Sequence, residues 1–251
     1  MHSRLQCGSI ALPGYGTMVI IGVLTVCAIA SLVAIKRNLS FDSIAKFGIF
    51  GGVSAVLGAK LYSVLLLEMG TGFTLTLTPE TIKSAGYSFM GGMPLGLIGI
   101  WVCCLIYKID FARYMNYLAF EIPLLNSIWK VGCHLGGCCY GIEYDGRLAI
   151  SFPEGGPAPA NALLFPIQLT EAAFNFLLAI VLYIYGNKKE HALEMYLLLY
   201  GLARVPIEFL RYKTLKSTLV SNIVVSFSFV IAAIIMQYAK KRDTLGGNPC
   251  E

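Results

Sequence analysis

The sequence predicts an all-α, polytopic membrane protein, and three observations support this fold class. Of the 251 residues, 57% are hydrophobic and only 13% are charged, whereas about 25% of residues are charged in a typical soluble domain. The mean hydropathy is +0.70. The apolar residues also cluster into stretches of about 20 residues, the length that an α-helix needs to cross a bilayer. We therefore expect a single integral membrane domain over residues 1–251.

Seven stretches have this length, and short polar or basic links separate them. The first, third and seventh contain no charged residue, whereas the second, fourth and sixth contain ionisable side chains. The longest links, about 69–87 and 141–164, are rich in Gly, Pro and Thr, and we expect them to form outer loops. In chain order, the seven expected transmembrane helices are 15–35, 43–67, 88–107, 111–135, 165–185, 192–210 and 217–239.

The Lys and Arg residues of the links predict the orientation. When the links are assigned to alternating sides, nine of these residues lie on the side of the C-terminus and six on the side of the N-terminus. Cytoplasmic loops carry an excess of Lys and Arg, so we expect the N-terminus outside and the C-terminus inside. The net charge of +5 then reflects topology and contact with membrane lipid, and it requires no nucleic-acid partner.

Ionisable residues within the expected spans predict a polar interior. A charge at the centre of a spanning helix costs at least about 2.5–3.5 kcal/mol, so it usually faces a partner or a wet cavity. We expect a polar cavity that is shared by the second, fourth, fifth and sixth spans and opens to the outer leaflet. The residues concerned are Lys46, Lys60, Glu121, Lys130, Glu171, Glu194, Arg204 and Glu208; Lys46 and Glu194 lie near helix ends and are expected to reach the interface.

Arg204, Glu208 and Arg211 are spaced by four and three residues, which places them on one helical face. They could form a salt-bridge ladder that neutralises itself. Alternatively, the two arginines receive a phosphate, for which a guanidinium has suitable geometry, and Glu208 orients them.

The segment GCHLGGCCYG (132–141) allows four interpretations. Cys133, His134, Cys138 and Cys139 could bind a metal, but the spacing is not C-x-x-C and adjacent cysteines rarely ligate one ion. Cys133 and Cys138 could form a disulfide on an oxidising outer face. A cysteine close to Lys130 could be a reactive thiol, because positive charge lowers a thiol pKa. The interpretation we favour is soft, close packing at a helix-to-loop turn.

Six segments, in the same order along the chain, resemble the prolipoprotein diacylglyceryl transferase family of bacterial inner membranes. The match runs from about residue 15 to residue 211 and includes the family's Y-G-x-x-R-x-x-x-E-x-x-R pattern. The segments are LPGYG (12–16), FGGVSAVLGAKLY (50–62), YSFMGGMPLGLIG (87–99), WKVGCHLGGCCYG (129–141), FPIQLTE (165–171) and YGLARVPIEFLR (200–211).

The resemblance implies a multi-pass protein of the bacterial cytoplasmic membrane that acts in lipoprotein biosynthesis. It implies transfer of a diacylglyceryl group from phosphatidylglycerol to the cysteine thiol of a prolipoprotein signal-peptide segment, or to another thiol acceptor, with release of glycerol phosphate. We expect no cofactor and no metal. In this interpretation Arg204 and Arg211, helped by Lys130, hold the phosphate and Glu208 braces the arginines. The other positions expected at the substrate site are Tyr15, Lys60, Met90, Cys133, His134, Cys138, Gly141, Gln168 and Glu171.

The sequence departs from the family pattern at several of these positions. Met90 stands where the family has the histidine of S-F-H-G-G, and a thioether cannot carry a proton. Lys130 and Lys60 stand where arginines are usual, and Cys133 and Cys138 stand where Asn and Glu are common. His134 could replace the missing base, although the family usually has Phe there and an aromatic packing role is favoured.

These departures leave two other functions open. The first is a non-catalytic, lipid-binding relative that lost the chemistry. The second is a redox-active membrane protein in which Cys133 and Cys138 cycle between thiols and a disulfide. For the favoured enzyme, the retained residues predict that Arg204→Ala abolishes activity and that Cys139→Ala is tolerated.

Overall fold

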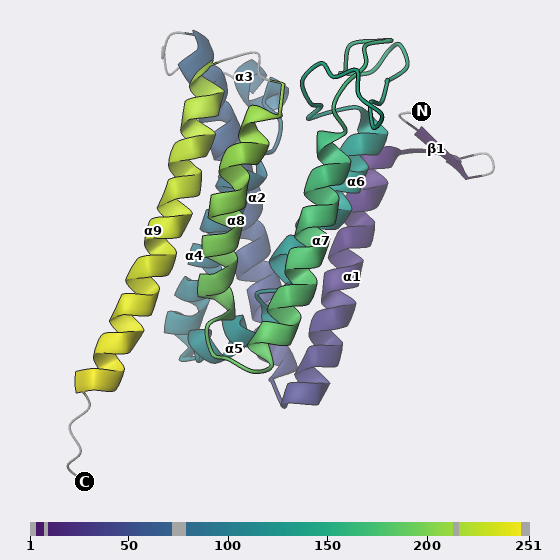
Figure 1. The fold of residues 1–251 in the computed structure, drawn as a ribbon. Helices are drawn as coiled ribbons and strands as arrows, with labels where there is room; N and C mark the ends of the chain where they lie inside the picture. The colour runs from purple at the N-terminus through teal and green to yellow at the C-terminus, as the bar shows by residue number, and fades with distance from the viewer. Residues whose placement is uncertain (1–3, 8–9, 72–78, 213–215, 247–251) are drawn as a thin grey trace.

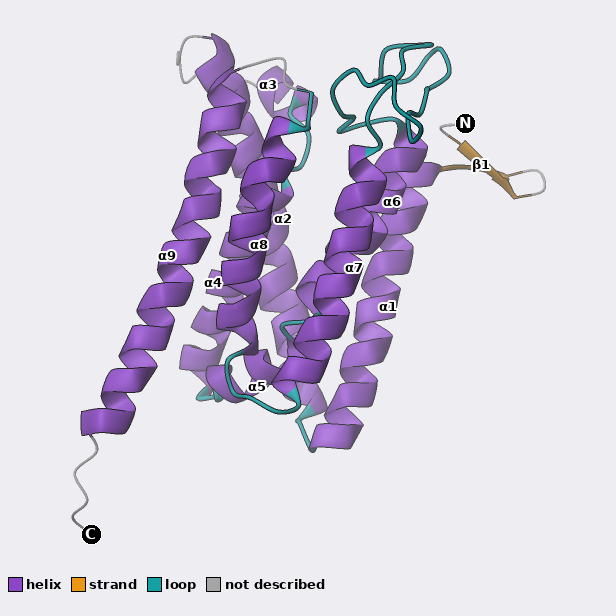
Figure 2. Cartoon of the chain, in the orientation of Figure 1, coloured by secondary structure: helices purple, strands orange, loops and turns teal. Residues whose placement is uncertain are grey.

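The computed structural model describes residues 4–7, 10–71, 79–212 and 216–246, and most of them lie in long helices that form one bundle (Figures 1 and 2). In chain order the elements are β1 (Arg4–Cys7), β2 (Ile10–Pro13), α1 (Gly14–Arg37), α2 (Phe41–Thr71), α3 (Pro79–Ser84), α4 (Phe89–Tyr107), α5 (Phe111–Leu118), α6 (Glu121–Gly136), α7 (Ile167–Gly186), α8 (Ala192–Phe209) and α9 (Lys216–Gly246).

The prediction of a polytopic, helical membrane protein is confirmed in its coarse form. Among the described helices, five are long and apolar enough to cross a membrane: α1, α2, α4, α7 and α9. The helix α6 has only 16 residues, and the 18 residues of α8 include three charged ones, Glu194, Arg204 and Glu208. The antiparallel hairpin of β1 and β2 and the short helix α3 within the predicted 69–87 loop were not expected.

The predicted fourth span, 111–135, is wrong as a continuous helix. It is divided at Ala119 and Phe120 into α5 and α6. Pro123 explains the break, because a proline inside a helix clashes with the carbonyl four residues earlier, whereas the first turn tolerates it. The Asp110 side chain starts α5 by accepting a hydrogen bond from the Arg113 backbone N–H at 3.0 Å.

Glycines bring α2 and α4 into close contact. A Cβ atom on Gly58 would lie 2.5 Å from the Gly91 carbonyl oxygen, and one on Gly99 would lie 2.7 Å from the Phe50 carbonyl oxygen. The optimal separation between non-bonded carbon atoms is about 3.5–4.0 Å, and Cβ contacts under 3.0 Å essentially never occur, so side chains at these positions would separate the two helices. Small residues serve the same purpose in membrane bundles generally.

The bundle has two distinct ends (Figure 1). One end carries the N-terminal hairpin, α3 and the 137–166 loop, and the other carries α5 and the turn between α7 and α8. The described chain ends at the second of these ends. This arrangement agrees with termini on opposite sides of a membrane, and Lys213, which contributes to the predicted charge bias, lies outside the described residues.

Candidate active site

Five ionisable side chains, four of them buried and one partly buried, meet near the end of the bundle that carries the 137–166 loop; we call them the charged cluster. They come from the last two turns of α6, the second turn of α7, the end of α8 and the residues just after it. The sequence predicted that these three helices share a polar interior. The members are Lys130, Glu171, Arg204, Glu208 and Arg211.

Glu171 is the centre of the charged cluster. Its Oε2 atom lies 2.5 Å from Lys130 Nζ and 2.8 Å from Arg204 Nη1. Its Oε1 atom lies 3.8 Å from Arg211 Nε, a charge–charge contact rather than a hydrogen bond. Only 1% of the Glu171 side chain is exposed, so one carboxylate holds three cations almost out of contact with solvent.

Glu208 is the second anion of the cluster. Its Oε2 atom lies 2.7 Å from Arg204 Nη2 and 3.8 Å from Arg211 Nη1. The Asn222 amide in α9 donates to Glu208 Oε1 at 2.5 Å, and the Tyr62 hydroxyl in α2 donates to Asn222 Oδ1 at 2.9 Å. Glu208 is thus part of a chain of contacts that links α8 to α9 and α2.

The charged cluster has a net positive charge. Lys130, Arg204 and Arg211 contribute +3 and the two glutamates −2, which leaves +1. Arg204 Nε and Arg211 Nε are buried and have no hydrogen-bond partner among the described residues. Buried charges are stable only when they are compensated, so this arrangement favours the binding of one further anion with several acceptor oxygens.

The other predicted residues lie around this cluster or away from it. Gln168 is buried in α7 and donates to the Cys138 carbonyl at 3.0 Å. Gly141 forms a β-bridge with Arg211, and a Cβ atom there would lie 2.4 Å from the Phe165 carbonyl oxygen. The loop therefore contacts the segment that carries Arg211 through a position that only glycine can occupy.

Tyr15, Met90 and Lys60 have different surroundings. Tyr15 begins α1 beside the end of α6, where a Cβ atom on Gly136 would meet the Tyr15 side chain. Met90 is buried in the apolar core. Lys60 donates to the Ala85 carbonyl and lies over the Tyr87 ring, 4.9 Å from its centroid. Lys60 therefore lies apart from the charged cluster, because its long side chain extends to polar groups in the link between α3 and α4.

Three thiols of the GCHLGGCCYG segment converge. The Sγ atoms of Cys133, Cys138 and Cys139 all lie within 4.8 Å of one another, and the cysteines are free rather than disulfide-bonded. Hydrogen bonding by the other two thiols, followed by the positive charges of Arg211 and Lys130, holds the pKa of the Cys139 thiol well below its ordinary value. We call Cys133, Cys138 and Cys139 the thiol cluster.

His134 lies outside the thiol cluster and packs against an aromatic ring. Its ring packs edge-on against Phe152, with 5.7 Å between ring centroids. Its Nδ1 atom is buried without a hydrogen-bond partner among the described residues. Of the two roles considered for His134, replacement base and aromatic packing, this geometry favours packing.

An apolar groove of about 490 Å³ runs between α7 and α8. Phe174 and Ala203, which line it, are each within one turn of a member of the charged cluster, Glu171 and Arg204 respectively. A molecule with a phosphate and long hydrocarbon chains could therefore contact both features at once. The lining residues are Phe174, Leu177, Leu178, Val181, Leu199, Leu202 and Ala203.

A comparison with known protein families agrees with the order of the sequence motifs. Residues 3–239 match the family described as prolipoprotein diacylglyceryl transferase. The chain belongs to this family.

Named relatives support the assignment. The phosphatidylglycerol–prolipoprotein diacylglyceryl transferase of Clostridium tetani is 30% identical over 203 residues, which cover 79% of this chain and 80% of the relative. Transferase 2 of Clostridium perfringens is 29% identical over 203 residues, with 78% of each chain covered. The transferase of Photobacterium profundum is 28% identical over 253 residues, with 94% and 92% covered.

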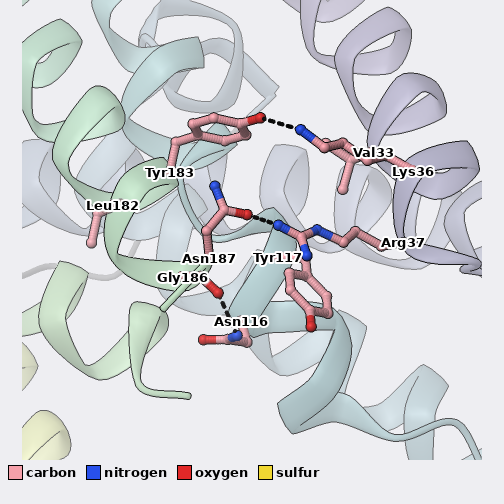
Figure 3. Close-up of a pocket in the computed structure, with 9 residues that line it drawn as sticks. All are labelled: Val33, Lys36, Arg37, Asn116, Tyr117, Leu182, Tyr183, Gly186 and Asn187. Carbon is pink, nitrogen blue, oxygen red and sulfur yellow. Dashed lines mark hydrogen bonds between the residues drawn. The ribbon is translucent and has the colours of Figure 1, made fainter. Parts of the chain in front are cut away.

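A second hollow in this diacylglyceryl transferase family member lies at the opposite end of the bundle (Figure 3). Its volume is about 10 Å³, which is room for about one water molecule. Lys36 Nζ contacts the Tyr183 hydroxyl at 3.4 Å, and Arg37 donates to Asn187. These cations fix α1 against α7, and the hollow is too small for a lipid headgroup.

Two residues of the site were missed by the sequence argument, Tyr62 and Asn222. Both are neutral, and the search for charges within the spans did not include them. A signal for Asn222 exists, because an amide side chain in an apolar helix usually bonds to a neighbouring helix. For Tyr62 no comparable signal exists, since tyrosine is common at many places in membrane helices.

Proposed function

We propose that this protein transfers a diacylglyceryl group from phosphatidylglycerol to the cysteine thiol of a prolipoprotein, and that the charged cluster is its active site. One observation carries the proposal: a buried cluster of charge +1 lies beside an apolar groove. Family membership and the names of the relatives support the same activity.

In this mechanism Lys130, Arg204 and Arg211 hold the phosphate of phosphatidylglycerol, and the two glutamates keep the cations in position. The sulfur of the acceptor thiolate attacks the glyceryl carbon that bears the phosphate. The C–S bond forms as the C–O bond breaks, and its electron pair goes to the phosphate oxygen, so glycerol phosphate leaves. The cations stabilise the negative charge that develops on the leaving group, and electrostatic stabilisation of this kind is usually the largest single contribution to catalysis.

The proposal includes a topology. All seven helices α1, α2, α4, α6, α7, α8 and α9 cross the bacterial cytoplasmic membrane, with the N-terminus outside, the C-terminus inside and the site open to the outer leaflet. The buried ion pairs support this for α6 and α8, because their charges are compensated within the bundle. The prolipoprotein signal-peptide segment then reaches the site from the outer side.

The groove gives a prediction about the lipid donor. Ala203→Trp should fill part of the groove between α7 and α8 and raise the KM for long-chain phosphatidylglycerol about tenfold, equivalent to about 1.4 kcal/mol of binding free energy. The KM for a short-chain phosphatidylglycerol should change little. Leu105→Trp, at an exposed position of α4, is the matched control. Equal effects on both donors would contradict an acyl-chain role for the groove.

A transfer assay tests the proposed function directly. The purified full-length protein in detergent is supplied with phosphatidylglycerol and a synthetic lipobox peptide, and mass spectrometry follows the peptide and the released glycerol phosphate. We expect a diacylglyceryl-modified peptide and an equal amount of glycerol phosphate. Glycerol phosphate without peptide modification would indicate another acceptor. Lipid binding without either product would contradict the enzyme and favour a non-catalytic, lipid-binding relative.

A further inference from the structure

The thiol cluster has the geometry of a metal site. In a tetrahedral zinc site the Zn–S distance is about 2.3 Å, so neighbouring sulfurs lie about 3.8 Å apart. The three sulfur atoms of Cys133, Cys138 and Cys139 lie within 4.8 Å of one another, and shifts of about 1 Å in free side chains would close this difference. Thiolates select zinc and other soft ions over the cations that prefer oxygen ligands.

The backbone explains how adjacent cysteines can share one ion. The sequence argument disfavoured a metal because the spacing is not C-x-x-C and adjacent cysteines rarely ligate one ion. Cys139, however, has a φ of 54°, in the left-handed region that non-glycine residues rarely adopt. Gly137, with φ 68°, ends α6. With the chain turning sharply at both positions, the sulfur atoms of Cys138 and Cys139 come close to that of Cys133.

The neighbouring charges suit an anionic metal complex. Zinc with three thiolates has a charge of 2 − 3 = −1, and the cations Arg211 and Lys130 lie close enough to Cys139 to act on it electrostatically. The two clusters are connected: Gln168 in α7 donates to the Cys138 carbonyl, and Gly141 pairs with Arg211. An ion held here would lie beside the proposed phosphate site rather than in a separate part of the protein.

We propose that Cys133, Cys138 and Cys139 bind Zn²⁺ as three thiolate ligands and leave the fourth position open for the acceptor thiol. This inference rests on the proposed transfer function. His134 is not part of the group of converging ligand atoms, and Cys138 and Cys139 are at least partly exposed, so an acceptor can reach this side of the cluster. An open fourth position distinguishes catalytic from structural zinc sites.

The zinc ion would activate the acceptor thiol without a protein base, a role that the thioether of Met90 cannot fill. A thiol that coordinates zinc loses its proton, and here that proton passes to water. The resulting zinc-bound sulfur attacks the glyceryl carbon, the C–S bond forms, and the C–O electron pair leaves with the phosphate as before. The product is a neutral thioether, which is a poorer ligand than a thiolate, so it dissociates and the site is free again.

Metal binding is measured first, without any substrate. The reduced, metal-free, full-length protein is equilibrated with Zn²⁺, desalted and analysed for metal, and a parallel sample receives Co²⁺. We expect about one tightly held zinc per chain and the intense near-ultraviolet absorption of thiolate-bound cobalt. Cys139→Ser should weaken zinc binding at least about tenfold, whereas Cys27→Ser, an exposed cysteine in α1, should not. Absence of bound metal, or equal retention by both variants, would overturn the proposal.

The transfer assay then separates this inference from the proposed function. If the metal-free protein transfers as fast as the zinc-loaded protein, the role of zinc is overturned and the transferase remains. If zinc binds but the loaded protein transfers nothing, the proposed function fails together with the acceptor role. The sequence alone predicted that Cys139→Ala is tolerated; with zinc we expect its transfer rate to fall at least about tenfold and to require a higher pH.

Discussion

Replacing Arg204 with alanine is expected to abolish transfer and to destabilise the protein. The guanidinium bridges Glu171 and Glu208 at 2.8 and 2.7 Å, and only 3% of its side chain is exposed. Removing one partner of a buried pair costs about 3–5 kcal/mol, because the other charge remains buried and uncompensated. Loss of one such electrostatic group at a reaction centre lowers kcat about 10²–10³-fold. Thermal unfolding in detergent and the peptide transfer assay measure the two effects.

Two further variants make the Arg204 experiment specific. Arg204→Lys keeps the charge but cannot bridge both carboxylates with one planar group, so its activity should fall between wild type and alanine. Arg113→Ala removes an exposed arginine at the other end of the bundle and should leave both measurements unchanged. If Arg204→Ala retained wild-type transfer, the charged cluster would not be the phosphate site.

Gly91→Ala should have the largest effect on the packing of the bundle. A Cβ atom at this position would lie 2.2 Å from Tyr62 Cβ and 2.4 Å from the Gly58 carbonyl oxygen. Overpacking of this kind typically costs about 1–3 kcal/mol. The affected side chain matters, because the Tyr62 hydroxyl bonds to Asn222. Displacement of Tyr62 should therefore lower transfer as well as the midpoint of thermal unfolding.

The matched control is Gly52→Ala, on the neighbouring helix α2, where a Cβ atom would have no neighbour within 4 Å. Alanine is a better helix former than glycine by about 1 kcal/mol, so this variant should be at least as stable as wild type. Tyr62→Phe separates the two consequences of Gly91→Ala, since it removes the hydroxyl without overpacking. Equal midpoints of thermal unfolding for Gly91→Ala and Gly52→Ala would contradict the close approach of α2 and α4.

The sequence predicted the charged cluster better than it predicted the helices around it. Arg204 and Glu208 were recognisable because charges in an apolar helix need partners and their spacing puts them on one face. The break before α6 was not predicted, because a hydropathy count ignores the steric effect of Pro123. The contacts of Lys60 outside the charged cluster were not predicted either, because the sequence gives no measure of how far a flexible lysine can reach.

The convergence of the thiol cluster could not be predicted from spacing. Whether adjacent cysteines point together depends on the backbone of Cys139, whose positive φ has no sequence signal, since non-glycine residues adopt it only when the surrounding structure imposes it. The sequence could only leave metal, disulfide, reactive thiol and packing open as alternatives. The groove between α7 and α8 could not be predicted from the sequence either, because it depends on how the two helices pack in three dimensions.

The ion pairs also bear on how the chain could enter a membrane during synthesis. On the proposed topology, α6 brings Lys130 and α7 follows with Glu171, so this hairpin can insert with its charges already paired. The next helix, α8, carries its own pair, Arg204 and Glu208, one turn apart. Only Arg211, the most exposed member at 15% of its side chain, is left in excess. Within the charged cluster, each charge except that of Arg211 thus meets an opposite charge on the same helix or on the next helix to be made.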